Sequence, residues 1–298
     1  MFENPSGPWA LIVHGGAKEM GPGEEDANRQ GVLEALAEGR KILERGGTAV
    51  DAVEASIRKL EDLPIFNAGH GSSLNEEGEV EMCSGMMDGR DLSVGAVGAI
   101  KGVRNPVSVA RAMLGEKETL IVGEGARTFA RNKNLPLVNN DALITELRES
   151  ELAEHDTVGA VALDKGGNIA AGTSTGGLTG AHVGRIGDSP VPGCGFYADN
   201  HVGAVAFSGD GETIQRLALA GRVMAALDRG EHPEQAVAKA VAMLPGTGGA
   251  DADGGGIAIS KDGRVGWAHN SPDFAVAMIT SDMNEPKAWL GKKEEKNG

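Results

Sequence analysis

The sequence predicts an α+β fold, in which antiparallel β-sheets are stacked on each other and flanked by helices. Two observations predict it: strand-like and helix-like segments come in blocks, and two of the strand blocks have the pattern of hairpins. A third is composition. Gly supplies 46 of the 298 residues, roughly twice the usual share of about 7 per cent, yet 40% of the residues are hydrophobic, so the glycines belong to a folded chain. Aromatic residues are only 3%, so aliphatic and alanine side chains must fill the core.

The first half of the chain alternates between apolar runs and amphipathic stretches. Asp51 follows Thr48 at the spacing of a capping box, which predicts a helix start, and Pro64 prevents that helix from continuing. In chain order the expected elements are a buried strand at 9–13 that ends in a turn at 14–16, helices at about 24–45 and 48–62, strand-like pieces at 80–82 and 92–100, and a helix at 106–114.

The second half begins after a break in composition. Gly is absent from 126 to 158, and the part from 136 to 156 carries six acids against one Arg, which is typical of a solvated, loosely held segment. Beyond it the expected elements are a hairpin of 158–163 with 169–175, a strand at 202–207, helices at about 212–229 and 233–243, and a hairpin of 257–260 with 265–268.

Charge and cysteine content exclude several classes of function. The formal net charge of −15 argues against a nucleic acid or an anionic membrane as a partner and suits a cationic or ordinary small-molecule ligand. The apolar run near the start has only about five residues, too few for a signal peptide or a membrane span, which favours a cytoplasmic protein. Cys83 and Cys194 lack metal-ligand spacing, and we expect two buried free thiols.

Hydroxyl residues surrounded by glycine gather directly after the acidic segment, at Thr157 and within 172–177. A threonine hydroxyl is a weak nucleophile unless a base lies within hydrogen-bond reach. One solution makes Thr the first residue of a chain, because its α-amine, with a pKa of about 8, then accepts the hydroxyl proton and returns it to a leaving amine. Such an enzyme needs a cleavable loop before the Thr, and 136–156 supplies one. Without further support, a structural Thr is the commoner interpretation.

With these residues in view, the sequence resembles the plant-type asparaginase and isoaspartyl peptidase family of N-terminal nucleophile hydrolases, which is related to glycosylasparaginase. The motifs that carry the resemblance follow the family's order from residue 9 to about 280, and are HGGA at 14–17, FNAGHGS at 66–72, HDTVGAV at 155–161, TSTGG at 173–177 and GRIGDSP at 184–190. The resemblance implies a four-layer αββα sandwich, made as a precursor that cuts itself between Asp156 and Thr157. Residues 1–156, with the acidic linker 136–156, would form a large subunit and 157–298 a small one, within one structural domain.

The resemblance also implies roles for single residues. Thr157 would be the nucleophile, and Thr175 would hydrogen-bond its hydroxyl. Ser208 and Gly209 would form a hydroxyl-plus-backbone oxyanion hole. The aspartyl substrate would be bound by Arg185 at its α-carboxylate and by Asp188 and the Gly211 carbonyl at its α-ammonium, while Asn67 would position the catalytic Thr.

Simple chemistry agrees with the pair at 185 and 188. A guanidinium binds a carboxylate bidentately, and a nearby carboxylate suits an ammonium, so the two can recognise an amino-acid zwitterion. The plainer alternative is a surface ion pair worth under about 1 kcal/mol.

No catalytic cofactor is expected. The loop 60–70 resembles the family's sodium-binding loop, which uses main-chain carbonyls, here those of Leu60, Glu61, Leu63, Phe66, Ala68 and His70. His14 and His70 lack the spacing of a zinc site, so we expect structural or loop-positioning roles for them. The resemblance further implies a homodimer of cleaved units that acts on a small dipeptide or on asparagine.

Two departures from the family pattern bear on substrate. Asp156 stands where most isoaspartyl peptidases have Gly. The motif His-Asp-Thr is the one found in glycosylasparaginases, so a glycosylasparaginase-like amidase is an alternative. Asp210 lies in Ser-Gly-Asp-Gly-Glu, where relatives carry a neutral residue. A carboxylate facing the leaving group would favour basic residues, as in the β-aspartyl-arginine and β-aspartyl-lysine released from cyanophycin. Alternatively, Asp210 faces solvent or caps the helix near Glu212. An unprocessed, non-catalytic paralogue is the third alternative.

Overall fold

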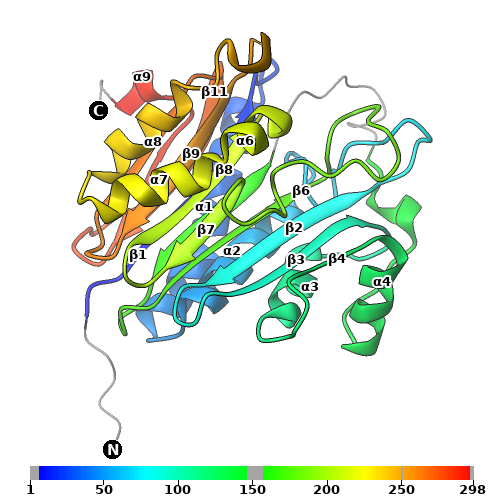
Figure 1. Ribbon diagram of the computed structural model, residues 1–298, viewed down its shortest axis with the longest axis horizontal. Helices are drawn as coiled ribbons and strands as arrows, with labels where there is room; N and C mark the ends of the chain where they lie inside the picture. The colour runs from blue at the N-terminus through cyan, green and yellow to red at the C-terminus, as the bar shows by residue number, and fades with distance from the viewer. Residues whose placement is uncertain (1–6, 146–156, 250, 296–298) are drawn as a thin grey trace, which may run out of the picture.

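The computed structural model describes residues 7–145, 157–249 and 251–295. Within them, two β-sheets lie face to face and each carries helices on its outer side, which gives the four layers of an αββα sandwich and confirms the predicted α+β class (Figure 1). Asp156 and the end of the expected acidic linker, 146–156, lie outside the described residues.

The larger sheet has the strand order β12-β11-β1-β5-β6-β2-β3-β4, and the smaller sheet has the order β10-β9-β8-β7. The strands of the larger sheet are β1 (Ala10–Lys18), β2 (Met82–Asp88), β3 (Ser93–Ile100), β4 (Leu120–Val122), β5 (Val158–Leu163), β6 (Ile169–Thr175), β11 (Asp273–Thr280) and β12 (Lys287–Trp289). Those of the smaller sheet are β7 (Phe196–Asp199), β8 (Gly203–Gly209), β9 (Gly254–Ser260) and β10 (Val265–His269).

The helices form the two outer layers. α1 (Glu25–Glu44), α2 (Ala49–Asp62) and α3 (Pro106–Met113) pack on the larger sheet, and α7 (Leu219–Asp228) and α8 (Pro233–Val241) pack on the smaller one. The remaining helices are α4 (Gly123–Asn132), α6 (Gly211–Leu217) and α9 (Lys292–Glu295), with 3₁₀ turns at Asn140–Leu143 and Thr247–Gly249.

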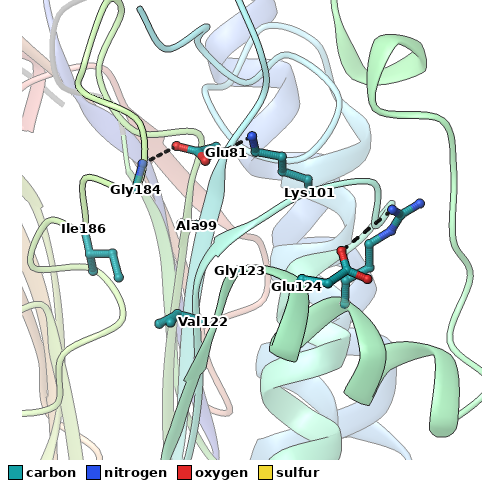
Figure 2. Close-up of a pocket in the computed structure, with 9 residues that line it drawn as sticks. Glu81, Ala99, Lys101, Val122, Gly123, Glu124, Gly184 and Ile186 are labelled. Carbon is teal, nitrogen blue, oxygen red and sulfur yellow. Dashed lines mark hydrogen bonds and ion pairs between the residues drawn. The ribbon is translucent and has the colours of Figure 1, made fainter. Parts of the chain in front are cut away.

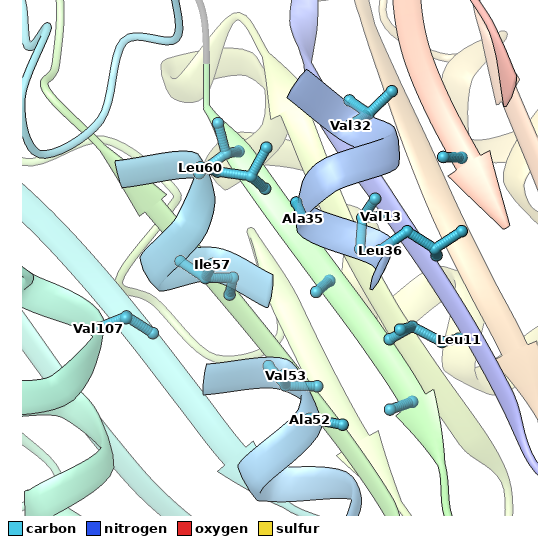
Figure 3. Close-up of a cluster of buried hydrophobic side chains, with 14 of the residues drawn as sticks. Leu11, Val13, Val32, Ala35, Leu36, Ala52, Val53, Ile57, Leu60 and Val107 are labelled. Atoms are coloured by element: carbon cyan, nitrogen blue, oxygen red, sulfur yellow. The ribbon is translucent and has the colours of Figure 1, made fainter. Parts of the chain in front are cut away.

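Strand β1 shows how the layers are divided. Successive side chains on a strand point to opposite faces. Leu11 and Val13 therefore lie in the cluster under α1 and α2, where Figure 3 shows them beside Leu36, whereas Ile12 lies in the separate cluster between the two sheets. A third apolar cluster lies between the smaller sheet and the pair α7 and α8.

The unusual glycine content has a packing role in this core. A side chain at Gly85 would place its Cβ 2.3 Å from the ring of Phe196, so β2 can pack on that ring only as glycine. The same holds where Gly256 faces Phe207, with a Cβ at 2.6 Å. Sheet glycines thus make room for the few aromatic rings of the chain, because contacts this short are never tolerated in a close-packed interior.

The larger sheet combines strands that precede residue 157 in the sequence with strands that follow it. β5 and β6 lie between β1 and β2, and pair with them in antiparallel register. A cut before Thr157 would therefore leave the two pieces joined by complete ladders of main-chain hydrogen bonds.

Several elements differ from the sequence prediction. The glycines after His14 do not end the first strand, because they form a β-bulge and β1 continues to Lys18. The helix expected at 212–229 is two helices, α6 and α7, broken at Ala218, whose φ of 50° is left-handed. β4 was not expected, and it pairs with β3 in parallel within an otherwise antiparallel sheet, since α3 forms the crossover between them.

None of the described helices is long and apolar enough to cross a bilayer. A cytoplasmic location stays a prediction from the sequence.

Candidate active site

Thr157 stands immediately before β5, an inner strand of the larger sheet. It is 6% exposed. Its backbone N–H donates to the Ser208 hydroxyl at 3.0 Å, and its own Oγ1 lies 2.9 Å from Oγ of Ser189. Both polar atoms of the proposed nucleophile are therefore held by hydroxyls that come from other parts of the chain.

Ser208 lies at the end of β8 in the smaller sheet and connects it to the larger one. Besides Thr157, it accepts a hydrogen bond from the backbone N–H of Ala17 at 3.0 Å. The bulge in β1 directs this N–H toward β8. A hydroxyl can accept two hydrogen bonds and donate one. Because Ser208 already accepts two, its O–H remains available as a donor. That donor suits an oxyanion.

Gly209 follows with a φ of 141°, a conformation that glycine adopts readily and other residues do not. A Cβ here would lie 2.4 Å from the carbonyl oxygen of Asp253. Glycine is thus required where the chain turns from β8 into the site.

In the uncut chain the Thr157 hydroxyl and Thr175 do not bond each other. Thr175 ends β6 and is 5% exposed, but its Oγ1 accepts the backbone N–H of Gly177 at 3.1 Å. In the uncut chain it is Ser189, not Thr175, that bonds the Thr157 hydroxyl. The reason is local: the chain turns after β6, and that turn brings Gly177 back onto the Thr175 side chain.

Asn67 fixes the turn that follows Thr175. Its amide nitrogen donates to the Gly177 carbonyl at 2.8 Å, and its side-chain oxygen accepts the backbone N–H of Ser73 at 2.8 Å. A Cβ at Gly176 would lie 2.3 Å from that oxygen. The hydrogen bonds of Asn67 therefore hold the turn next to Thr175 rather than Thr157 itself.

Arg185 does not stand free for a substrate carboxylate. Its Nε and Nη2 donate to the two carboxylate oxygens of Glu212 at 2.9 and 2.7 Å, a bidentate pair in which the Arg185 side chain is 17% exposed. The prediction from sequence placed this guanidinium on the substrate and left Glu212 without a role. In the uncut chain, a carboxylate of the protein occupies that position.

Asp188 and Gly211 lie beside this pair. A Cβ at Gly211 would be 2.8 Å from Oδ1 of Asp188 and 3.1 Å from Nη2 of Arg185, so only glycine permits this approach. Burial raises the pKa of Asp188 to about 7, Arg185 opposes the rise, and the carboxylates of Glu212 and Asp210 add to it. Oδ2 of Asp188 is buried and has no hydrogen-bond partner among the described residues.

Asp210 is the N-cap of α6. Its Oδ1 accepts the backbone N–H of Thr213 at 2.7 Å, which matches the capping alternative considered from the sequence. The cap leaves its charge in place. That charge acts on Asp188, as does the charge of Glu212, so two carboxylates raise the pKa of Asp188 and the guanidinium of Arg185 lowers it.

The expected sodium loop is closed by turns of the backbone. The carbonyl oxygens of Leu60, Glu61, Leu63 and Phe66 accept one backbone N–H each, from Leu63, His70, Phe66 and Ala68 respectively. Each carbonyl oxygen has two lone pairs. One therefore remains on each, and main-chain oxygens of this kind suit a hard cation.

The side chain of Glu61 is fully buried behind this loop. Its Oε1 accepts from Oγ of Ser174 at 2.7 Å and from the backbone N–H of Val107 at 2.9 Å, while Oε2 has no partner among the described residues. Burial raises the pKa of Glu61 to about 8 against these hydrogen bonds. Glu61 thus links the loop to β6, one residue before Thr175.

Two cavities share the loop that carries Arg185. The smaller contains the groups described above and is lined by Thr157, Thr175, Gly177, Leu178, Arg185, Asp188, Ser189, Gly209 and Gly211. The larger, of about 440 Å³, opens between β3, α4 and the other side of the loop, where Figure 2 shows Gly184 bonded to Glu81. Gly184 and Ile186 line this second cavity, whereas Arg185 between them lines the first.

His14 and the two cysteines differ in their burial. His14 is fully buried and stacks on Phe274. Burial lowers its pKa to about 3, with the backbone of Thr157 opposing the change. Cys83 is a buried free thiol as expected, whereas Cys194 is partly exposed.

Sequence reasoning missed two groups of the site, Ser189 and Glu212. Both stand inside motifs that it had singled out, Ser189 directly after Asp188 and Glu212 directly after Gly211. The available signal was that each lies next to a residue already assigned to the site. Ser and Glu are common residue types, however, and only the contacts of the folded chain distinguish these two.

Comparison with known proteins identifies the family of the chain. The model of the asparaginase family matches residues 7–156 and 148–286. The chain is 41% identical to isoaspartyl peptidase/L-asparaginase of Xenopus laevis over 96% of its length and 92% of the relative. It is 39% identical to the Homo sapiens protein of the same name over 90% of its length and 92% of that protein. The chain therefore belongs to the asparaginase family and is a hydrolase.

Proposed function

We propose that the protein is an isoaspartyl peptidase with L-asparaginase activity, and that Thr157 is its nucleophile once the bond before it is cut. The names of relatives about 40% identical over most of the chain support the general activity. Hydrolases of this family need no catalytic cofactor. The observation that carries the residue assignment is the buried Thr157, with hydroxyls on both its polar atoms and with Arg185 and Asp188 lining the same pocket.

Cleavage of the precursor would use the Thr157 hydroxyl. Oγ1 of Thr157 attacks the carbonyl carbon of residue 156, a C–O ester bond forms, and the C–N bond to Thr157 breaks. The nitrogen takes up the proton lost by the hydroxyl and becomes an amine. Water then hydrolyses the ester, which leaves a carboxyl group on residue 156 and restores the hydroxyl. In the precursor, Thr157 N–H already lies on Ser208, so the new amine would be retained beside the nucleophile.

Substrate hydrolysis repeats the same bond changes. The α-amine takes the Thr157 hydroxyl proton as the oxygen attacks the β-carbonyl of the aspartyl group, and it passes that proton to the leaving amine. The Ser208 hydroxyl and the Gly209 backbone would stabilise the negative oxygen of the tetrahedral intermediate. Water then releases aspartate from the ester.

Recognition of the aspartyl group would use charges of both signs. The substrate α-carboxylate would take the place of Glu212 on Arg185, and the α-ammonium would lie against Asp188 and the carbonyl of Gly211. The short approach of Gly211 to both side chains supports a single compact site for the zwitterion. Before substrate binds, Asp188 experiences the charges of two other carboxylates, Glu212 and Asp210, and of one guanidinium, Arg185.

We extend the proposal to the leaving group. The surplus of negative charge that includes Asp210 would favour β-aspartyl-arginine and β-aspartyl-lysine, the basic dipeptides from cyanophycin, over acidic ones. The helix cap at Asp210 does not remove this charge, so capping and charge selection are compatible.

Two further features belong to the proposal. The carbonyls of Leu60, Glu61, Leu63, Phe66, Ala68 and His70 would hold a structural sodium ion, which a higher melting temperature in NaCl than in choline chloride would support. A homodimer of cleaved units would cover the edge strand β4, where Leu120 is 40% and Val122 48% exposed. Light scattering tests that assembly.

Mass spectrometry of the incubated protein tests the main proposal. The 30.6 kDa chain should give two fragments, the smaller beginning at Thr157, and Thr157→Ala should stay whole and inactive with its fold retained. Turnover by Thr157→Ala would show that Thr157 is not the nucleophile. A wild-type chain that never cleaves would favour a non-catalytic paralogue, and preference for a glycosylated asparagine would favour the glycosylasparaginase alternative.

A further inference from the structure

Ser189 makes a contact that the proposed chemistry does not yet use. Its hydroxyl lies 2.9 Å from Oγ1 of Thr157, and the residue is 1% exposed. Either hydroxyl can be the donor. Thr157 is stiff at χ1 because it is β-branched, so a single hydrogen bond to Oγ1 is enough to select its rotamer.

The backbone of Ser189 is itself firmly held. Its carbonyl accepts the hydroxyl of Thr173 on β6 at 2.6 Å. On its other side, a Cβ at Gly195 would lie 2.9 Å from the Ser189 Cα, so the chain packs directly on it. Ser189 lies within a turn that is closed by the hydrogen bond from the Val191 N–H to the Asp188 carbonyl at 2.9 Å. Because its backbone is held by these contacts, the Ser189 hydroxyl keeps one position relative to Thr157.

We propose that Ser189 is a positioning residue for Thr157, which fixes the direction of the nucleophilic oxygen in the precursor and in the cleaved enzyme. With Ser189 as the donor, its hydroxyl occupies one lone pair of Oγ1, which leaves the other lone pair for the attack and the Thr157 proton free to point toward the nitrogen. As Oγ1 attacks, its proton passes to the amide nitrogen in precursor cleavage or to the α-amine in turnover. Ser189 gains and loses nothing covalently.

The positions of the other hydroxyls support this division of roles. Ser208 bonds the nitrogen of Thr157, and Thr175 bonds Gly177. Ser189 is therefore the hydroxyl side chain that the described structure places on Oγ1 itself. The inference rests on the proposed function, because it presupposes that Thr157 is the nucleophile.

The test compares Ser189→Ala with a matched loss of a buried hydroxyl elsewhere. Ser84 on β2 is fully buried and donates to the carbonyl of Thr173 at 2.7 Å, so Ser84→Ala removes an equivalent atom outside the site. We expect Ser189→Ala to slow precursor cleavage about tenfold, the loss typical of one positioning hydrogen bond. Ser84→Ala should cleave at the wild-type rate, with a similar change in melting temperature.

The matured enzymes give a second readout. Ser189 contacts the nucleophile and not the substrate's charged groups, so Ser189→Ala should lower kcat with KM unchanged. A purely structural loss would disturb the neighbouring Asp188 and raise KM. Ser189→Thr, which restores a hydroxyl, should recover cleavage to within about threefold of wild type; if it melts below Ser189→Ala, the Ala comparison alone decides.

Thr157→Ala in the same experiment separates the two ideas. Cleavage or turnover by Thr157→Ala would refute the proposed nucleophile whatever Ser189 does. An inert Thr157→Ala beside a Ser189→Ala that cleaves and turns over like Ser84→Ala would overturn only the role of Ser189. A raised KM in Ser189→Ala, or no recovery in a stably folded Ser189→Thr, would overturn it too.

Discussion

The guanidinium of Arg185 lies bidentate on the carboxylate of Glu212, with N···O distances of 2.9 and 2.7 Å. This is the geometry with which an Arg binds the carboxylate of an amino acid. Arg185 also lines the pocket of Thr157. Glu212 therefore stands in the uncut chain where we propose that the substrate α-carboxylate binds.

Glu212→Gln should consequently lower KM by about two- to tenfold and leave kcat unchanged. The amide competes less well for Arg185 than a carboxylate does. The substitution also removes one of the charges that raise the pKa of Asp188, which favours the ionised form that the substrate ammonium needs. Steady-state kinetics with L-asparagine measures the effect. Glu234→Gln, which breaks an exposed pair with Lys292, is the control; a higher KM in Glu212→Gln would show instead that Glu212 positions Arg185.

The raised pKa of Asp188 predicts a pH dependence of substrate capture. Below a pH of about 7 the carboxyl is protonated and no longer pairs with an ammonium, so kcat/KM of the cleaved enzyme should fall about tenfold per pH unit from this group alone. The α-amine of Thr157 adds its own decline below about pH 8. Asp188→Asn should be much less active and should lose the step near pH 7 while retaining the one near pH 8. A profile unchanged in shape would contradict the role of Asp188.

Glu61 predicts a pH dependence of stability. Its pKa is about 8 in the folded protein against an ordinary 4.5, so between these values the folded chain binds a proton that the unfolded chain releases. Stability from this group is therefore greatest at low pH and is lost as the pH rises from 4.5 to 8. The loss amounts to about 3 kcal/mol between pH 5 and 7.5.

Urea unfolding of Thr157→Ala, with and without Glu61→Gln, measures this loss without interference from cleavage. Other titrating groups cancel in the difference between the two proteins. Relative to its parent, the Gln variant should gain stability as the pH rises. Parallel curves for the two proteins would mean that Glu61 is ionised in the fold.

Local signals in the sequence predicted the parts of the fold that are determined locally. Thr48 caps α2 as expected because its hydroxyl needs only the N–H of Asp51, three residues on. The break at Ala218 was missed because neither Gly nor Pro marks it, and an Ala in the left-handed region is held there by the surrounding structure. Strand β4 was not predicted at all, and its parallel pairing with β3 departs from the antiparallel sheets expected, because the direction depends on how α3 crosses the sheet.

The site, too, has features that the sequence predicts and features that it does not. Thr157, Arg185 and Asp188 stand in motifs that family resemblance recognises, and all three line one pocket. The hydrogen bonds among them were less predictable, because the Thr157 to Ser189 contact joins residues 32 apart and the Arg185 to Glu212 pair joins residues 27 apart. Such pairings depend on the arrangement of loops between two sheets, for which periodicity carries no signal.

Asp210 allows the proposed preference for basic leaving groups to be separated from its structural role. Its carboxylate caps α6 through the N–H of Thr213, and Asn and Thr are also good N-caps. Asp210→Asn and Asp210→Thr should therefore keep the fold and remove only the charge. Asp210→Ala would lose the cap as well, at a cost of about 1 kcal/mol in stability.

We expect kcat/KM for β-aspartyl-arginine to exceed that for β-aspartyl-leucine in the wild type, and the ratio to fall about tenfold in both capped variants. Activity on L-asparagine should change far less. Its leaving group is ammonia, which has no side chain that could interact with the Asp210 carboxylate. Added salt should reduce the wild-type ratio, since screening weakens an exposed charge interaction. If the wild type and Asp210→Asn share one ratio, Asp210 acts only as a helix cap, and the preference for basic dipeptides loses its structural basis.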